Sequence, residues 1–371
     1  MSHLDPNRDV KLLKVIQNLI GVVVVLIAGI IIILFISIFH WDMKSLFTRS
    51  NNESVQELEK KRSFLKWKSE NIVADEMATF WAPASFDEMP KDSEAKARIE
   101  YGKELIAHTA KYLGPNGSVR KISNGMNCQN CHLDAGTKVW GNNYGAVFST
   151  YPKYRARSGI EEDITKRIND CLERSLNGKA LPIDSREMQS MKAYIEFIGK
   201  DVKKGVKPKG SGIFELKFLE RAADPTRGKV VFVNKCQSCH QANGEGLLTE
   251  NKVEYIYPPL WGPHSYNNGA GLFRISRFAG YVKYNMPQGA SFQNSQLSDE
   301  ECWDVAAFVN SQSRPVKNIK ADWPKIAEKP IDHPFGPFAD GFTEAQHKFG
   351  PFSPIVSERK RQKEIKDTIK I

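Results

Sequence analysis

The sequence has 371 residues, with 53 Lys and Arg against 43 Asp and Glu, for a formal net charge of +10. At roughly 100–200 residues per domain, this length predicts two domains with additional segments. A hydrophobic fraction of 41%, including 20 Phe, 11 Tyr and 7 Trp, excludes a mainly disordered chain. The basic charge favours anionic partners, but no nucleic-acid-binding motif is present, so no nucleic-acid partner is expected.

The first forty residues predict a membrane anchor over 15–40. Val15–Phe39 contains no charged side chain, and a helix of this length spans the roughly 30 Å hydrocarbon core of a bilayer. A cleaved signal peptide is the alternative, but its apolar region is shorter and ends at a small-residue site. The stretch Ser37–Trp41 offers no such site.

Basic residues before the anchor predict its orientation. Arg8, Lys11 and Lys14 place the segment 1–14 in the cytoplasm. The expected location is therefore the cytoplasmic (inner) membrane, crossed once, with soluble domains on the periplasmic side. Residues 41–75 are polar and mixed in charge, which predicts a spacer.

Two segments of the soluble part follow the same plan, and they predict two domains, 76–205 and 206–315. Each contains a C-x-x-C-H motif, at 128–132 and at 236–240. A stretch rich in glycine, proline and aromatic residues follows each motif. The sheet pattern is weak throughout, so both domains are expected to be mainly helical.

Amphipathic helices frame each motif. Helices are expected before them at Glu94–Leu113 and about Pro225–Val233. Two more, around Ser185–Ile198 and Ser298–Asn310, begin at serine caps followed by acidic residues. Lys203–Gly212, rich in lysine and glycine, reads as the linker between the domains.

The tail, 316–371, has few helix indications before its last dozen residues. It carries Phe-Gly-Pro-Phe twice, at 335–338 and at 349–352. Apolar, proline-rich segments of this kind pack across a domain surface, so an extended C-terminal wrap is expected.

C-x-x-C-H is the attachment motif of c-type haem, in which both thiols bond to the haem and the histidine binds the iron. A redox C-x-x-C without haem is the alternative, but histidine follows immediately both times. The motifs predict two covalently bound haem c groups, attached through Cys128, Cys131, Cys236 and Cys239, with His132 and His240 as iron ligands. The expected fold is mainly α, with two cytochrome-c-like domains, an N-terminal transmembrane helix and an extended C-terminal tail.

The second axial ligand decides the haem potential. In the second domain, Met286 is the only methionine after His240 and lies in an Asn-Met-Pro loop. It is the expected ligand, with a core role as the alternative and Lys283 as a possible competitor. In the first domain, Met188 and Met191 fall on the last helix and are expected in the core.

Cys171 is the expected ligand or reactive thiol of the first domain. Arg167 precedes it by four residues and Arg174 follows by three, so all three share one helix face. Guanidinium groups beside a cysteine stabilise the thiolate, which is both nucleophile and metal ligand. A structural cysteine is the alternative, and Cys302 is expected to fill the core.

The sequence resembles the thiosulfate dehydrogenase (tetrathionate-forming) family of dihaem cytochromes c. The matching stretches are 127–136, 154–158, 167–179, 257–263 and the repeated Phe-Gly-Pro-Phe. The resemblance implies His/Cys ligation of the active-site haem through Cys171 and His/Met ligation of the second through Met286. It also implies substrate contacts by Arg157 and Arg167. The anchor and Leu176, where methionine is common, depart from the family pattern.

The implied reaction joins two thiosulfates into tetrathionate, and the same site could run it in reverse, because only the relative potentials set its direction. Electrons would pass from the first haem to the second and on to an acceptor such as a small cytochrome or a respiratory complex. Arg157, Arg167 and Arg174 would offset the repulsion between the dianions. Alternatively, these arginines form surface ion pairs with Glu161, Glu162 or Asp163.

Two rival functions stay open at this point. One is an anchored electron-transfer cytochrome of a respiratory chain without substrate chemistry, and the other is a different enzyme that acts on sulfur compounds. The first would need the haems and Met286, but not the arginine and cysteine face around Cys171.

Overall fold

The structure is a computed structural model that describes residues 13–35, 37–38, 57–63, 66 and 80–369. The chain divides into two compact units, Met1–Met77 and Ala78–Ile371. The expected cytoplasmic segment 1–14 lies outside the described residues except for its last two positions. Most of the expected spacer 41–75 also lies outside them, and its described part includes the helical stretch 57–63.

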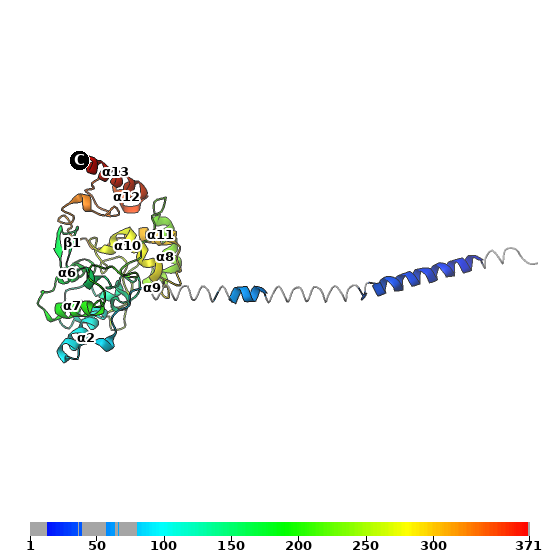
Figure 1. Ribbon diagram of the computed structural model, residues 1–371, viewed down its shortest axis with the longest axis horizontal. Helices are drawn as coiled ribbons and strands as arrows, with labels where there is room; N and C mark the ends of the chain where they lie inside the picture. Colours follow the sequence, from blue (N-terminus) through cyan, green and yellow to red (C-terminus); the bar gives the residue numbers. More distant parts are fainter. Residues whose placement is uncertain (1–12, 36, 39–56, 64–65, 67–79, 370–371) are drawn as a thin grey trace, which may run out of the picture. The chain divides into compact units, whose positions relative to one another are not determined.

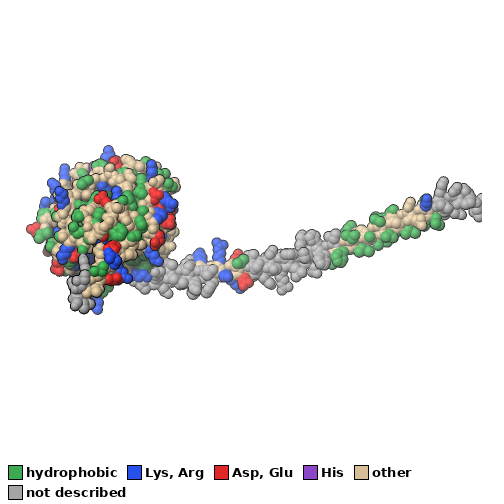
Figure 2. Space-filling model, turned by 90° about the horizontal axis from the view of Figure 1, so that it is seen from above, with side chains coloured by type: hydrophobic (Ala, Val, Ile, Leu, Met, Phe, Trp, Pro, Cys, Tyr) green, Lys and Arg blue, Asp and Glu red, His purple; other side chains and the backbone are tan. Residues whose placement is uncertain are grey.

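The N-terminal unit contains the expected apolar helix, Leu13–Phe35, with 23 residues. At 1.5 Å per residue the helix is about 35 Å long, enough to cross a bilayer. Its large apolar side chains, among them Val25 and Ile33, are exposed, and Figure 2 shows hydrophobic side chains along this helix. An uncovered, all-round apolar surface of this kind suits lipid better than water.

The first half of the larger unit is built on two crossed helices, α2 (Ser93–Ala107) and α7 (Arg186–Ile198). Gly102 lies at the crossing, where a Cβ atom would stand only 2.0 Å from the carbonyl oxygen of Ser190. The close approach of the two backbones therefore depends on a glycine at this position.

The helix expected over Glu94–Leu113 is interrupted at His108, and α3 (Thr109–Leu113) resumes after it. The side chain of Asn127 accepts a hydrogen bond from the backbone of Ala110 (2.8 Å). The hydroxyl of Thr109 accepts one from the backbone of Cys128 (2.9 Å). These contacts tie the second helical piece to the first C-x-x-C-H motif, which a straight helix would not meet in this way.

The second half repeats the plan with α8 (Pro225–Lys235) and α11 (Asp299–Asn310), which also cross at a glycine. A Cβ atom on Gly228 would lie 1.8 Å from the carbonyl oxygen of Asp304. The helix α10 (Ile275–Asn285) packs against α11, and Figure 1 shows α8, α10 and α11 together. The mainly α fold with a repeated plan is thus confirmed.

The remaining helices and strands complete the larger unit. They are the helices α4 (Leu133–Gly136), α5 (Val147–Thr150), α6 (Ile164–Arg174), α9 (Gln237–His240), α12 (Glu344–Phe349) and α13 (Ser353–Ile369), the 3-10 helices Phe86–Glu88, Cys128–Asn130, Gly271–Phe273 and Ile326–Glu328, and the strands β1 (Lys153–Arg155), β2 (Ile160–Glu162), β3 (Leu247–Leu248) and β4 (Tyr255–Tyr257). The strands form two antiparallel hairpins, β1–β2 and β3–β4.

The C-terminal tail packs against the second half of the unit. Phe352 is buried, and its ring lies 5.2 Å from that of Phe218 and 5.8 Å from that of Trp303. The tail is more helical than its sequence predicts, because α12 and α13 begin well before the last dozen residues.

Candidate functional site

The first motif begins on the 3-10 helix Cys128–Asn130. The ring atom Nδ1 of His132 lies 2.5 Å from the carbonyl oxygen of Asn142. Since a carbonyl oxygen only accepts, Nδ1 carries the proton and the lone pair of Nε2 is free for a metal. A hydrogen bond from the ring nitrogen that does not bind the metal, here Nδ1, orients a histidine ligand.

The second motif has the same arrangement. Cys236 directly follows α8, and α9 carries the rest of the motif. His240 is buried, and its Nδ1 lies 2.8 Å from the carbonyl oxygen of Pro258. Both histidines therefore present Nε2 with its lone pair, which fits an iron ligand in each half.

Burial decides the chemistry of the motif thiols. Desolvation raises the pKa of Cys128 and of Cys131 to about 12 and that of Cys236 to about 11. A redox dithiol needs a lowered pKa on its attacking cysteine. All six cysteines lie in the described part of the chain, and none forms a disulfide. The raised pKa of both thiols of the first motif, and of Cys236 in the second, therefore disfavours dithiol redox chemistry.

A hairpin places Arg157 beside α6. The strands β1 and β2 pair with Arg155 opposite Ile160, so residues 156–159 form the turn. The backbone of Gly159 donates to the carbonyl of Arg155 at 2.9 Å. Gly159 has a φ of +71°, in the left-handed region that glycine enters without steric cost. Arg157 thus stands in the turn, just before α6 begins.

The helix α6 carries the other predicted site residues. Asp163 caps its first turn, accepting from the backbone of Lys166 at 2.8 Å. Arg167, Cys171 and Arg174 all lie within this helix, so their four- and three-residue spacings put them on one face, as predicted.

Cys171 lies among the groups of the first motif. The pKa of Arg167 is raised, chiefly by its electrostatic interaction with Cys171. Cys171 interacts in the same way with Cys128, Cys131 and the buried Tyr144, whose pKa values are raised, first of all by burial. Tyr144 in turn stacks on the ring of the haem-motif histidine, with ring centroids 4.6 Å apart. The structure therefore brings Cys171 and the first C-x-x-C-H motif into one site.

Arg157 and Arg167 are half-buried, and neither guanidinium has an ion pair or a hydrogen bond among the residues that the structure describes. Of the acidic partners considered from the sequence, Glu162 lies 4.0 Å from Arg155 instead. Burial and the two arginines of α6 lower the pKa of Arg157 to about 10. Two guanidinium groups without a protein partner among the described residues therefore lie near each other in this site.

Arg174 differs from these two arginines. Its terminal nitrogens donate to both carboxylate oxygens of Asp322, at 2.7 and 2.8 Å. Because its charge is balanced within the chain, Arg174 offers an incoming anion less than Arg157 and Arg167 do. Its predicted contribution to substrate binding stays a prediction.

Met286 follows the last residue of α10 and is partly buried against the core. The side chain of Asn285 donates to the carbonyl of Trp140 (3.1 Å), and the hydroxyl of Tyr281 donates to the carbonyl of Asn130 (3.1 Å). Asn130 lies between the two cysteines of the first motif. The segment that carries Met286 is therefore joined directly to the first motif.

Other residues considered from the sequence have structural contacts. Lys283 pairs with Asp299 at 2.7 Å, which occupies its ammonium group. Met188, Met191 and Cys302 are fully or almost fully buried in the core, as expected.

Known proteins share this organisation. The SoxA/TsdA cytochrome c domain matches residues 118–203, and the cytochrome c family matches residues 225–313. A thiosulfate dehydrogenase of Psychrobacter arcticus is 39% identical over 235 residues, covering 63% of this chain and 68% of that protein. Another, of Allochromatium vinosum, is 40% identical over 199 residues, covering 53% and 72%. The chain belongs to the thiosulfate dehydrogenase family.

A solved structure agrees with this membership. The thiosulfate dehydrogenase TsdBA of Marichromatium purpuratum matches with a TM-score of 0.59 and 30% identity, over 64% of this chain. The match spans 50% of the length of that solved chain. With a cytochrome c domain around each C-x-x-C-H motif, this member of the thiosulfate dehydrogenase family is an oxidoreductase with two haem c groups.

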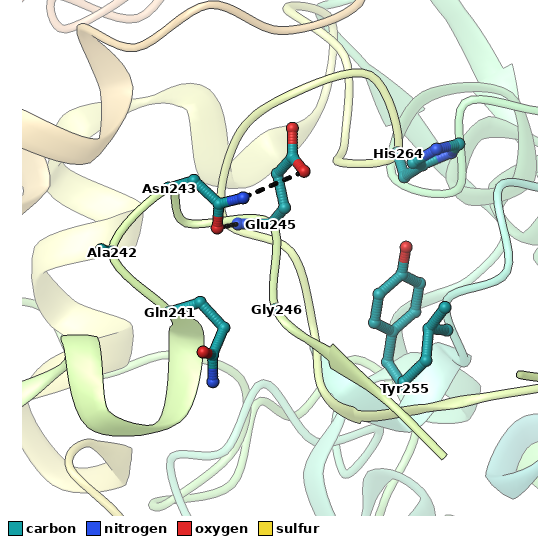
Figure 3. A pocket seen from close by; sticks show the side chains of 8 residues that line it. Gln241, Ala242, Asn243, Glu245, Gly246, Tyr255 and His264 are labelled. Atoms are coloured by element: carbon teal, nitrogen blue, oxygen red, sulfur yellow. Dashed lines mark hydrogen bonds between the residues drawn. The ribbon is translucent and has the colours of Figure 1, made fainter. Parts of the chain in front are cut away.

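The structure also has an open pocket of about 520 Å³, lined by residues that follow the second motif in the sequence. In Figure 3, Asn243 and Glu245 are hydrogen-bonded to each other, and Tyr255 and His264 lie across from them. No lysine or arginine is among the described residues that line the pocket, and Glu245 is acidic. It lacks the positive charge that a dianion requires, unlike the site at Arg157.

Sequence reasoning missed the contribution of the C-terminal tail to this site. Asp322 pairs with Arg174 across a separation of 148 residues, and the backbone of Trp323 donates to the carbonyl of Arg157 at 2.7 Å. No local pattern marks either residue, because the contact depends on how the tail crosses the first half of the unit.

Proposed function

We propose that this chain oxidises two thiosulfate dianions to one tetrathionate dianion at the site formed by Arg157, Arg167 and Cys171. The supporting observation is that two half-buried guanidinium groups without protein partners among the described residues lie beside a cysteine of the first motif's site. The names of the relatives support thiosulfate as the substrate.

Charge is the main obstacle to the reaction. Two unit charges of like sign 4 Å apart repel by roughly 4 kcal/mol at an effective dielectric constant of about 20, and each thiosulfate carries two charges. Arg157 and Arg167 supply fixed positive charge against this repulsion. Their planar forks donate in pairs to the oxygens of a sulfonate group. The arginines thus let two dianions approach each other.

Cys171 supplies the nucleophile. Its thiolate bonds to the terminal sulfur of one thiosulfate, giving a Cys–S–S–SO₃⁻ adduct and releasing two electrons. The terminal sulfur of the second thiosulfate then attacks the terminal sulfur of the first and displaces the Cys171 thiolate. The product is tetrathionate, and Cys171 returns to its starting form. Arg167, four residues earlier on α6, stabilises the Cys171 thiolate both before it attacks and after it is displaced.

Two bound haem c groups supply one-electron acceptors for this chemistry. We assign His132 and Cys171 to the iron of the first haem and His240 and Met286 to that of the second. The hydrogen bonds of the two histidine Nδ1 atoms support the roles of His132 and His240. The place of Met286 at the end of α10 supports its role, and a thioether ligand favours a relatively high potential.

The location and acceptor complete the proposal. The helix Leu13–Phe35 anchors the chain in the cytoplasmic membrane, with the haem domains on the periplasmic side. The acceptor is a small cytochrome or a respiratory complex. Retention of the intact N-terminus in carbonate-washed membranes supports the anchor, and a mature chain cleaved after this helix contradicts it.

The direct test of the proposed activity is a steady-state assay with thiosulfate and ferricyanide, in which tetrathionate is quantified. Two thiosulfates consumed for each tetrathionate formed, with two ferricyanides reduced, support the reaction. Absence of turnover in protein with both haems attached contradicts it and favours an anchored electron carrier.

A further inference from the structure

Three consecutive residues of the tail contact the helix and the hairpin turn that carry the proposed site. Asp322 pairs with Arg174 of α6. The backbone of Trp323 donates to the carbonyl of Arg157 in the hairpin turn. Pro324 packs on the same turn, where a Cβ atom on Gly159 would stand 2.5 Å from its ring. The segment 322–324 thus covers the turn that presents Arg157.

The backbone of Trp323 is held in an unusual conformation. Its φ is +63°, in the left-handed region that bulky residues rarely enter. Such a conformation persists only where surrounding contacts fix it, and outliers of this kind gather at ligand sites. The flanking contacts of Asp322 and Pro324 supply that constraint.

The indole N–H of Trp323 has no acceptor in the described part of the chain. The side chain is 9% exposed, and its Nε1 has no hydrogen-bond partner among the residues that the structure describes. The guanidinium carbon of Arg157 lies 5.8 Å from the centroid of the Trp323 ring. The ring centroids of Trp323 and His333 are 5.7 Å apart. A buried donor without an acceptor is costly, and the indole nitrogen can only donate. A donor beside an unpaired arginine fits an anionic acceptor.

We propose that Trp323 binds the substrate, its indole N–H donating to an oxygen of the oxyanion that Arg157 and Arg167 bind. This inference rests on the proposed oxidation of thiosulfate. Strong N–H donors prefer the sulfonate oxygens to the terminal sulfur. Trp323 and the two arginines would therefore bind one end of thiosulfate and leave its terminal sulfur for Cys171.

A haem propionate offers the same acceptor chemistry as a sulfonate, so the experiment separates the two sources. Trp323→Phe keeps the ring and removes the N–H. Loss of a contact to the substrate raises KM for thiosulfate about tenfold and leaves both haem potentials unchanged. A shifted haem potential with unchanged KM would assign the donor to a propionate and overturn the proposal.

Two further variants make the test specific. Trp323→His restores an N–H donor and is expected to lower KM relative to the phenylalanine variant. Glu328→Gln is the matched control, because Glu328 joins the same tail to the hairpin through the hydroxyl of Tyr154 at 2.6 Å. It is expected to leave KM unchanged. Equal KM values in all three variants and the parent would sink the inference, whereas an inactive parent would instead contradict the proposed function.

Discussion

Arg174 and Asp322 form a two-pronged ion pair between α6 and the C-terminal tail, with nitrogen–oxygen distances of 2.7 and 2.8 Å. The two side chains are only 10% and 12% exposed. The pair fastens the tail to the helix that carries Cys171. It also makes the two arginines of α6 differ, because a carboxylate balances the charge of Arg174 and, among the described residues, none pairs with Arg167.

Replacing Asp322 with asparagine leaves the Arg174 guanidinium buried without its counter-charge. We expect the free energy of unfolding to fall by about 3 kcal/mol, measured by denaturant titration of the haem-loaded protein. The KM for thiosulfate should fall, because a negative charge beside the dianion site is lost. A raised KM would contradict this electrostatic role and indicate structural damage alone.

Arg157 and Arg167 are expected to act through both charge and shape. Alanine at either position should lower kcat/KM for thiosulfate by about 10²- to 10³-fold, and lysine should recover part of the loss. Arg155→Gln is the matched control, because this residue belongs to the same hairpin but lies near Glu162, at 4.0 Å. An equal loss in that variant would show that the hairpin, and not an anion contact, was disturbed.

His333 predicts a loss of stability in acid. Burial, with nearby positive charges, lowers its pKa from the ordinary 6.5 to about 4. The unfolded chain then takes up a proton below pH 6.5 that the folded chain refuses until about pH 4, so stability falls as the pH falls through this window. We expect His333 to cost about 2 kcal/mol between pH 7 and pH 5.

The His333→Gln variant checks this assignment by denaturant unfolding at both pH values. Its stability should change less between pH 7 and pH 5 than that of the parent protein. The same pH dependence in both proteins would show that other groups carry the acid sensitivity.

The glycines at the two helix crossings predict matched stability effects. A methyl group on Gly102 or Gly228 would meet a backbone carbonyl at 2.0 or 1.8 Å. Alanine at either position should lower the free energy of unfolding by about 2–3 kcal/mol, by forcing the helices apart. Gly271→Ala is the control, since nothing lies within 4 Å of an added Cβ there. A loss of the same size in the control would contradict the packing argument.

Local patterns in the sequence were sufficient for much of the fold. The serine caps at Ser185 and Ser298 begin helices where expected, because the capping side chain and its helix are neighbours in the chain. The face shared by Arg167, Cys171 and Arg174 follows from helix periodicity alone. The haem motifs were evident for the same reason, since their donors lie within five residues of each other.

Contacts between distant segments could not be predicted in this way. After the interruption at His108, the helix is held by Asn127, which directly precedes the first C-x-x-C-H motif. An ion pair of Arg174 was considered only as an alternative, with Glu161, Glu162 or Asp163, and it forms instead with Asp322 in the tail. Nothing local to Trp323 indicates that it covers Arg157. The contacts of Asp322 and Trp323 arise only once the tail crosses the first half of the unit.

The most direct test of the central claim compares Cys171→Ala with Cys302→Ala, each with both haems attached. Cys302 is fully buried in the core and takes no part in the proposed chemistry. Tetrathionate formation from thiosulfate should vanish in the first variant and persist in the second. Tetrathionate formation at the parent rate without Cys171 would contradict the account.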